Sequence, residues 1–355
     1  MKTSMRKKMS VCIIASSLLA GFAVDSIAAE KKDNQWLWPD GVKKIKYLSG
    51  ADNTEQPALF YKPEKKGPLP LLVALHTWSA GYLQPETGYA KWCVDKGWVF
   101  IHPDFRGSNK KPSATGSELV VKDIISAVEY AKKNADIDTD RIYLIGGSGG
   151  GYASLLMAGR APEIWAGVSA WVPIFDLKAW HEETKKAKRG YFKNIEDSCG
   201  GAPGASPAVD EQYKLRSACT YIQNAKNVHL DINTGIHDGH TGSVPVSHSL
   251  NAFNALAKEQ DKIQDSDIKF MTDNQGVPET LNQKISDPLY GKNTPLFRKI
   301  SGNARVTVFE GGHNTLTEAG LTWLEHQKKS QPPVWDVKKT NTKVKFTEKD
   351  INTGK

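Results

Sequence analysis

The sequence has little cysteine, no long apolar run and only a small excess of positive charge. Four cysteines in 355 residues are too few for a fold built mainly on disulfides. The longest uncharged apolar run, from Val11 to Val24, has 14 residues, whereas a helix that spans a bilayer needs about 20. No spacing of cysteine and histidine is typical of a zinc site, so we expect no metal and no cofactor. Hydrophobic residues (39%) and charged residues (24%) occur at the frequencies of folded proteins, which excludes disorder and collagen-like repeats.

Part of the positive charge is confined to the start of the chain. The whole sequence has 47 basic and 39 acidic side chains, a net charge of +8. The first 29 residues account for +3 of this charge through Lys2, Arg6, Lys7, Lys8 and Asp25. The remaining +5 is spread over the rest of the chain, so we expect no nucleic-acid partner.

The N-terminal segment has the pattern of a secretory signal peptide. Its basic start precedes the apolar run, and small residues follow, with Ala28 and Ala29 as the favoured cleavage positions. We expect residues 1–29 to be a signal peptide, and the mature protein to be periplasmic or secreted without stable membrane insertion. An N-terminal membrane anchor is the alternative. The sequence indicates no oligomeric state.

Three cysteines lie outside this segment. An oxidising compartment permits a disulfide, and Cys199 and Cys219 lie 20 positions apart in one stretch rich in glycine and proline. We therefore favour Cys199 and Cys219 as the pair for a disulfide, and whether it forms stays open at this level. Cys93 falls in a predicted helix and is expected to be a buried apolar residue.

Short apolar runs rich in branched residues alternate with helical patterns along most of the chain. Eight runs are predicted strands: residues 42–48, 57–61, 69–75, 98–102, 141–145, 166–172, 228–232 and 306–309. Helices are predicted over 117–133, 149–159, 245–259 and 315–328. This alternation predicts an α/β fold with a mostly parallel sheet of about eight strands and helices on both faces. The first two strands, with no helix between them, should form an antiparallel edge.

Two stretches interrupt this rhythm and are predicted to be insertions. Residues 177–226 combine charged and aromatic side chains with a glycine- and proline-rich segment, and residues 260–303 are polar. Long insertions commonly form lids or binding loops, so we expect both to shape the substrate site. The predicted organisation is one catalytic domain, residues 30–329, followed by a polar tail, residues 330–355.

The strongest chemical signal is a serine in a glycine-rich turn. The strand 141–145 leads directly into Gly146-Gly147-Ser148-Gly149-Gly150-Gly151, and a predicted helix follows. This is the G-x-S-x-G pattern of a nucleophile elbow, in which the serine hydroxyl stands above the sheet edge. A phosphate-binding turn is the alternative, but the turn lacks both a Walker A lysine and the spacing of a dinucleotide site. We therefore predict that Ser148 is a nucleophile.

An aspartate and a histidine follow two later strands in the order that an α/β-hydrolase triad requires. Asp238 comes after the seventh predicted strand, and His313 comes after the eighth. Because the carboxyl ends of parallel strands gather at one edge of a sheet, we predict that both reach Ser148. Asp231, inside the strand, and Asp210, in the first insertion, are the rivals of Asp238.

Backbone amides and neighbouring histidines complete the predicted site. The Gly149 amide, at the start of the helix, and the Trp78 amide are predicted to form an oxyanion hole, with Thr77 as the alternative to Trp78. The Trp78 side chain fits packing or a pocket wall equally well. His237 and His240 flank the predicted aspartate and are expected to line the pocket or contact substrate, since no third metal ligand is evident.

Several segments together resemble the prolyl oligopeptidase-like serine hydrolases of the α/β-hydrolase fold. The resemblance runs from about Leu69 to His326 and is carried by His76-Thr77-Trp78, Pro103-Asp104-Phe105-Arg106-Gly107-Ser108, Asp140-Arg141-Ile142-Tyr143-Leu144-Ile145, the elbow, Asp238 with Val244-Pro245, and Gly311-Gly312-His313. It implies that Ser148 is the nucleophile, that His313 is the base and then the acid, and that Asp238 holds His313. Arg106 is a further candidate for substrate binding.

The chain also departs from this group. Thr77 stands where many relatives have glycine, and Val244 follows Asp238 at a longer interval than is usual. We expect no β-propeller before the hydrolase domain, because few residues precede the third predicted strand. The usual filter for peptide substrates would then be missing.

These departures favour a secreted esterase, because an exported hydrolase without a propeller is similar to the carbohydrate esterases that remove acyl or methyl groups from polysaccharides. The expected substrate is an ester-bearing glycan or a small-molecule ester. Four side chains are predicted to wall a sugar-binding cleft: Trp171, Trp180, His181 and Tyr191. The basic residues between 185 and 189 suit an acidic glycan, although an ordinary solvated surface has the same composition.

Two other functions stay open at this level. A small exported serine peptidase requires a site for the substrate N-terminus, and Glu182 and Glu183 are candidate carboxylates. A non-catalytic glycan-binding protein on a hydrolase fold is the second alternative, and the intact serine, aspartate and histidine disfavour it.

Overall fold

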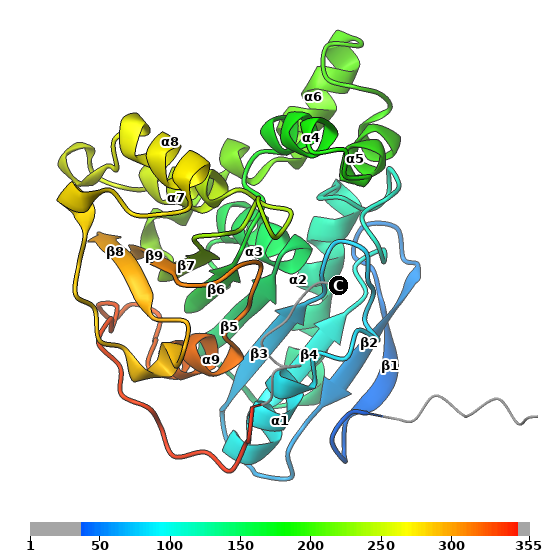
Figure 1. Cartoon of the computed structure of the whole chain (residues 1–355). Coiled ribbons are helices and arrows are strands. Elements are labelled where there is room, and N and C mark those ends of the chain that lie inside the picture. The colour runs from blue at the N-terminus through cyan, green and yellow to red at the C-terminus, as the bar shows by residue number, and fades with distance from the viewer. Residues whose placement is uncertain (1–36, 347–355) are drawn as a thin grey trace, which may run out of the picture. The chain divides into compact units, whose positions relative to one another are not determined.

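A mostly parallel sheet runs through the centre of the structure (Figure 1). The computed structural model describes residues 37–346, and the predicted signal peptide lies outside these residues. Within them the sheet has nine strands in the order β1-β2-β4-β3-β5-β6-β7-β9-β8. The strands are β1 (Lys43–Leu48), β2 (Glu55–Tyr61), β3 (Leu69–Leu75), β4 (Val99–Pro103), β5 (Ile137–Gly147), β6 (Gly167–Trp171), β7 (Leu230–Gly235), β8 (Pro295–Ser301) and β9 (Ala304–Phe309).

The two edges of the sheet are antiparallel. Strand β1 pairs antiparallel with β2, which confirms the prediction for the first two strands, and β8 pairs antiparallel with β9 at the other edge. The sequence prediction missed β8, which lies inside the predicted insertion 260–303. Its outer positions include the partly exposed Arg298 and Lys299, so this edge strand lacks the continuous apolar run of a buried parallel strand.

Helices cover both faces of the sheet. The α-helices of the described residues are α1 (Thr87–Lys96), α2 (Glu118–Asn134), α3 (Gly149–Arg160), α4 (Leu177–Lys186), α5 (Tyr191–Cys199), α6 (Pro207–Arg216), α7 (Val246–Asn254), α8 (Asp265–Asn274) and α9 (Thr317–Glu325). Buried side chains of α2, α3 and α7 pack in the core on one face, and those of α1 and α9 pack on the other. The α/β prediction with helices on both faces is therefore confirmed.

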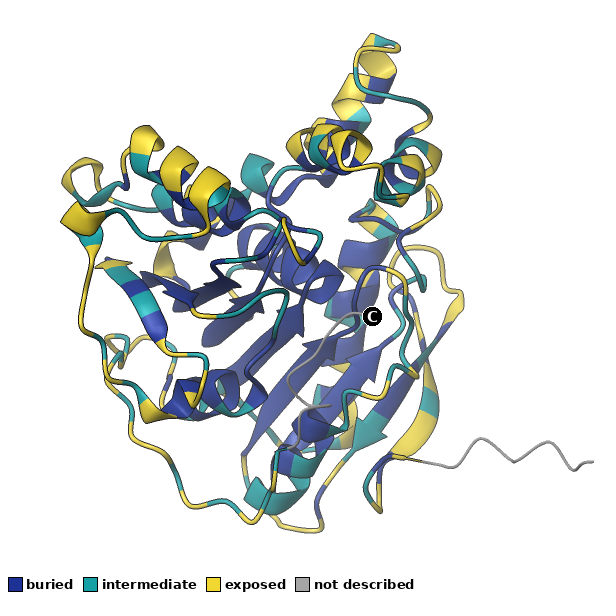
Figure 2. Cartoon of the chain, viewed as in Figure 1, coloured by how far each residue is buried: buried dark blue, intermediate teal, exposed yellow. Residues whose placement is uncertain are grey.

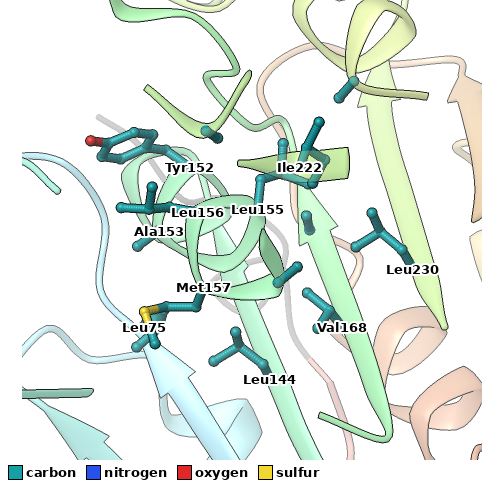
Figure 3. Packing of buried hydrophobic residues seen from close by; sticks show 14 of the residues in the cluster. Leu75, Leu144, Tyr152, Ala153, Leu155, Leu156, Met157, Val168, Ile222 and Leu230 are labelled. Atoms are coloured by element: carbon teal, nitrogen blue, oxygen red, sulfur yellow. The ribbon is translucent and has the colours of Figure 1, made fainter. Parts of the chain in front are cut away.

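The core lies directly beneath the turn between β5 and α3. Leu155, Leu156 and Met157 of α3 gather with Leu75 of β3 and Leu144 of β5 (Figure 3), and all five are fully buried. Strands β3, β4, β6, β7 and β9 are buried along their whole length, whereas the outer sides of α4, α5 and α6 are exposed (Figure 2). The turn that carries Ser148 thus rests on closely packed, fully buried side chains.

The first predicted insertion folds into α4, α5 and α6, which lie together beyond the carboxyl ends of the strands (Figure 1). Cys199 ends α5, and Cys219 lies in the turn after α6. Both are free thiols, so the favoured pair, Cys199 and Cys219, forms no disulfide. Burial raises the pKa of each thiol to about 11, which disfavours the thiolate that disulfide formation requires. Cys93 is buried in α1, as predicted.

The described part of the predicted tail packs against the domain. Trp335 stacks on Trp323 of α9 with ring centroids 5.7 Å apart. Farther along, the Thr342 hydroxyl donates to Asp95 of α1 at 2.8 Å. Among the helices of residues 37–346, none has the length and apolar character that crossing a bilayer requires.

Candidate active site

The serine elbow has the geometry that its sequence predicts. Ser148 stands between the end of β5 and the start of α3, with φ 56° and ψ −119°, a backbone conformation that residues with side chains rarely adopt. A Cβ at Gly150 would lie 2.1 Å from the Leu75 carbonyl oxygen, and a Cβ at Gly146 would lie 2.5 Å from the Gly150 carbonyl carbon. Only glycine therefore fits on either side of Ser148.

The structure joins Asp238 and His313 directly. The Nδ1 atom of His313 donates to Oδ2 of Asp238 at 2.7 Å, and Asp238 is 1% exposed. The other carboxylate oxygen, Oδ1, accepts from the backbone amides of Gly239 at 2.8 Å and Val244 at 3.1 Å. Because Nδ1 carries the proton that Asp238 accepts, the neutral His313 ring keeps Nε2 as its base.

The strand order brings Ser148 to the same edge. Ser148 follows β5, Asp238 follows β7 and His313 follows β9, and these strands run parallel in the sheet order β5-β6-β7-β9. Among the described residues 37–346, Ser148 Oγ and His313 form no hydrogen bond with each other. Contacts of this kind are often long without substrate and shorten when substrate binds.

Two backbone amides meet beside the elbow. Gly149 is the first residue of α3, where an amide has no carbonyl partner within the helix. A Cβ on Gly149 would lie 2.3 Å from the Trp78 nitrogen, so the two amides are close neighbours. The Thr77 amide donates to Gln84 Oε1 at 2.8 Å, which removes the alternative oxyanion donor. This arrangement supports Trp78 over Thr77.

His76 fixes the loop that holds Trp78. The two ring nitrogens of His76 lie 2.9 Å from the Thr77 carbonyl oxygen and 2.8 Å from that of Asp104. Its ring stacks on Phe105 with centroids 3.9 Å apart. The Asn109 amide donates to the Trp78 carbonyl at 2.8 Å. The position of the Trp78 amide is therefore set by several contacts.

Two predicted substrate-binding residues, Trp171 and Arg106, make structural contacts within the fold. Trp171 is fully buried in β6, where its Nε1 donates to Ser169 Oγ and its ring packs against Phe309. The side chain points into the core on the α1 and α9 side, since successive residues of a strand face opposite sides. Arg106 forms ion pairs with Asp123 at 2.6 Å and Asp52 at 2.9 Å, and so anchors the β1–β2 turn to α2.

Two other side chains that were predicted to wall a sugar-binding cleft, Trp180 and His181, are also closed to solvent. Trp180 is 1% exposed, and its Nε1 donates to the Ser243 carbonyl at 2.8 Å. His181 is fully buried between the carboxylates of Glu182 and Glu196. Tyr191 is partly exposed and stacks on Trp180. These side chains hold α4 and α5 together, so neither Trp180 nor His181 offers a free face to a sugar.

Of the two histidines that flank Asp238, His237 is partly exposed and His240 is exposed. His237 Nε2 contacts Glu310 Oε1 at 2.7 Å, and His240 Nε2 donates to the Thr272 carbonyl at 2.7 Å. Arg189 donates to the His240 carbonyl at 3.2 Å, so the basic segment after α4 reaches the loop that follows Asp238. Within the part of the chain that the structure describes, no group of three or more potential ligand residues could hold a metal ion.

The candidate carboxylates for a substrate N-terminus already have partners. Glu183 accepts from His248 Nε2 at 2.8 Å, and Glu182 contacts His181 Nδ1 at 3.1 Å. His248 in turn accepts the Phe175 amide at 3.0 Å through Nδ1. The sequence could not reveal these pairs, nor the Val244 amide on Asp238, because each depends on how the insertions fold.

Comparisons with known proteins indicate one protein family. Residues 87–275, more than half of the chain, match the Prolyl oligopeptidase family, and the matched segment includes Ser148 and Asp238. A segment of 111 residues is 32% identical to dipeptidyl aminopeptidase BIII of Pseudoxanthomonas mexicana and covers 28% of this chain and 16% of that protein.

Two solved structures with a similar fold are peptidases. The acylaminoacyl peptidase of Pyrococcus horikoshii superposes with a TM-score of 0.57 at 16% identity, over 83% of this chain and 43% of that chain. Oligopeptidase B of Leishmania major superposes with a TM-score of 0.53 at 13% identity, over 80% and 35%. This chain thus spans less than half the length of either. At such identity the likeness shows the α/β-hydrolase fold alone, and together with the family match it means that the chain belongs to the prolyl oligopeptidase family of serine hydrolases.

Proposed function

We propose that this protein is a serine peptidase that hydrolyses peptide bonds through Ser148, His313 and Asp238. The observation that carries the proposal is the buried hydrogen bond between Asp238 and His313, at the sheet edge where the elbow presents Ser148. Peptide cleavage is favoured over ester cleavage because the family and the similar proteins named above are peptidases. The burial of Trp171 and Trp180 also removes two of the side chains that were predicted to wall a sugar-binding cleft.

The proposed reaction follows from the roles of these groups. Ser148 Oγ attacks the substrate carbonyl carbon while its proton passes to His313 Nε2. The negative charge on the carbonyl oxygen is stabilised by the amides of Gly149 and Trp78. His313 then gives the proton to the leaving amine, which departs and leaves an acyl group on Ser148. A water molecule, deprotonated by His313, releases the acid and restores the serine.

The carboxylate of Asp238 supports both steps without taking the proton. It holds His313 in the tautomer that leaves Nε2 free, and it stabilises the imidazolium that forms. Its second oxygen already accepts two amide hydrogen bonds, which hold the carboxylate in one orientation.

We also propose that residues 1–29 direct export. The mass of the mature protein, isolated from its native host, tests this proposal.

The experiment compares three substrate classes on the purified chain: aminoacyl and acylaminoacyl p-nitroanilides, p-nitrophenyl acetate, and an acetylated or methylated glycan. We expect amide cleavage, and we expect Ser148→Ala to remove it by several orders of magnitude. Ser126→Ala, which removes a hydroxyl on α2 that contacts the Gly50 amide and not the triad, is the matched control and should keep full activity. Release of acyl or methyl groups from the glycan without any amide turnover would support the esterase instead. Retention on a glycan column without turnover would support a binding protein.

A further inference from the structure

Trp180, a side chain of the first insertion, contacts both the loop that follows Asp238 and the loop that holds Trp78. Trp180 belongs to α4, in the segment between β6 and β7, and its indole is 1% exposed. Its Nε1 donates to the Ser243 carbonyl oxygen at 2.8 Å. Ser243 lies in the loop that follows Asp238, 63 positions along the chain from Trp180. The hydrogen bond therefore ties an inserted helix to the loop of the triad aspartate.

The Ser243 carbonyl belongs to the same peptide group as the Val244 amide, which donates to Asp238 Oδ1 at 3.1 Å. A peptide group is planar, so fixing the direction of its carbonyl also fixes the direction of its N–H. A donor on the carbonyl further polarises the peptide group and strengthens the hydrogen bond that its N–H makes. The contacts thus form a continuous series from Trp180 through the peptide group and Asp238 to His313.

The ring of Trp180 makes a second contact of consequence. It packs edge-on against the Trp78 ring, with centroids 4.7 Å apart and planes at 73°. Trp78 is the residue whose amide faces Gly149 beside the elbow. Edge-to-face pairs of this kind hold their partners in a defined orientation. Displacement of Trp180 would therefore disturb the loop of the oxyanion donor as well as the loop of the triad aspartate.

We infer that Trp180 is a positioning residue: its indole N–H orients the Ser243–Val244 peptide group and thereby Asp238 and His313, while its ring fixes Trp78. Trp180 touches none of the reacting atoms. It acts on the triad of the proposed function, on which the inference rests. The inserted helices therefore contribute to the catalytic machinery itself, in addition to any part they take in binding substrate.

The test replaces Trp180 by phenylalanine, which keeps an aromatic ring and loses the N–H. We expect kcat to fall about tenfold with KM changed less than about twofold, as the loss of one supporting hydrogen bond predicts. Trp165→Phe is the matched control, because Trp165 is also buried and its Nε1 donates to the Met157 carbonyl at 3.1 Å, away from the triad. Both variants should lose similar stability, but only Trp180→Phe should lose activity.

A double-mutant cycle identifies the route of the effect. In an Asp238→Asn background, Trp180→Phe should change kcat less than about twofold, because its effect on the triad requires the aspartate. Equal tenfold losses in both backgrounds, or the same loss from Trp165→Phe, would overturn the inference. If Trp180→Phe does not fold, replacement of Trp180 by benzothienylalanine, which keeps the bicyclic ring without the N–H, gives the same comparison.

A spectroscopic measurement separates this inference from the proposed function. The proton that His313 Nδ1 shares with Asp238 gives a far-downfield resonance in proton NMR, and it is recorded without substrate. We expect Trp180→Phe to shift or broaden this resonance and Trp165→Phe to leave it unchanged. An unchanged resonance in Trp180→Phe would refute the positioning role. Retention of activity by Ser148→Ala would refute the proposed function, and the resonance would still decide the role of Trp180.

Discussion

Glu86 makes the stability of this protein depend on pH in a predictable way. It precedes α1, at the end of the loop that begins with Thr77 and Trp78, and its side chain caps no helix amide. Both of its carboxyl oxygens are buried, and among residues 37–346 neither has a hydrogen-bond partner. Burial without a partner disfavours the charged form and raises the pKa of Glu86 from 4.5 to about 8.

The sign and size of the effect follow from linkage. In the unfolded chain Glu86 loses its proton near its ordinary pKa of 4.5, while the folded protein keeps that proton until about pH 8. The folded state therefore binds more protons between these values, and its stability falls as the pH rises through this window. At 1.36 kcal/mol per pKa unit, the free energy of unfolding should fall by about 4 kcal/mol between pH 5 and pH 9.

Urea unfolding of the wild type and Glu86→Gln at several pH values measures this effect. The neutral glutamine cannot ionise, so the difference in unfolding free energy between the two proteins should grow in favour of Glu86→Gln by about 4 kcal/mol from pH 5 to pH 9. Glu163→Gln, at an exposed position, is the control for a glutamate-to-glutamine change. Parallel pH profiles for the wild type and Glu86→Gln would refute the assignment of this pH dependence to the buried carboxyl.

Two further predictions concern packing. Gly150→Ala places a Cβ 2.1 Å from the Leu75 carbonyl oxygen, so thermal unfolding should show a loss of about 2 kcal/mol in stability, and most of the turnover should be lost. The control Gly190→Ala, with no atom within 4 Å of its Cβ, should change neither stability nor turnover. Equal effects of the two substitutions would contradict the close packing of the elbow. Trp335→Ala removes a ring that stacks on Trp323 and lies 5.3 Å from the Arg305 guanidinium, and should lower the urea-unfolding free energy by about 2 kcal/mol. A loss below about 0.5 kcal/mol would show that the tail stabilises the domain little.

The parts of the site that sequence could predict are local. The elbow can be predicted from one short segment, because its strand, its serine with five glycines and its helix are contiguous. The positions of Asp238 and His313 followed from strand ends, because a parallel sheet places all its carboxyl ends at one edge. The sequence also favoured Asp238 over Asp231 correctly as the partner of His313, since Asp231 lies within β7 and pairs with Arg305.

The errors arise where the outcome depends on tertiary packing. Trp171 lies on a strand that is buried on both faces, and in such a strand the apolar pattern does not tell which side chain points toward the site. Trp180 has a composition that suits either a sugar-binding surface or a core, and only the fold of the insertion decides between them. The predicted sugar-binding cleft included these two residues. The Val244 amide on Asp238 is a backbone group and has no sequence signal at all.

The packing of the tail on α1 implies an order of assembly during folding. Lys96 Nζ lies 3.1 Å from Glu325 of α9 and donates to the Asn341 carbonyl at 2.9 Å. Closing a loop between Lys96 and Asn341, which are 245 positions apart, from an open chain costs about 5 kcal/mol of entropy. Once α9 has docked beside α1, only the 16 positions after Glu325 remain to be closed, at about 2.5 kcal/mol. Docking of α9 should therefore come first, and the tail should fasten last.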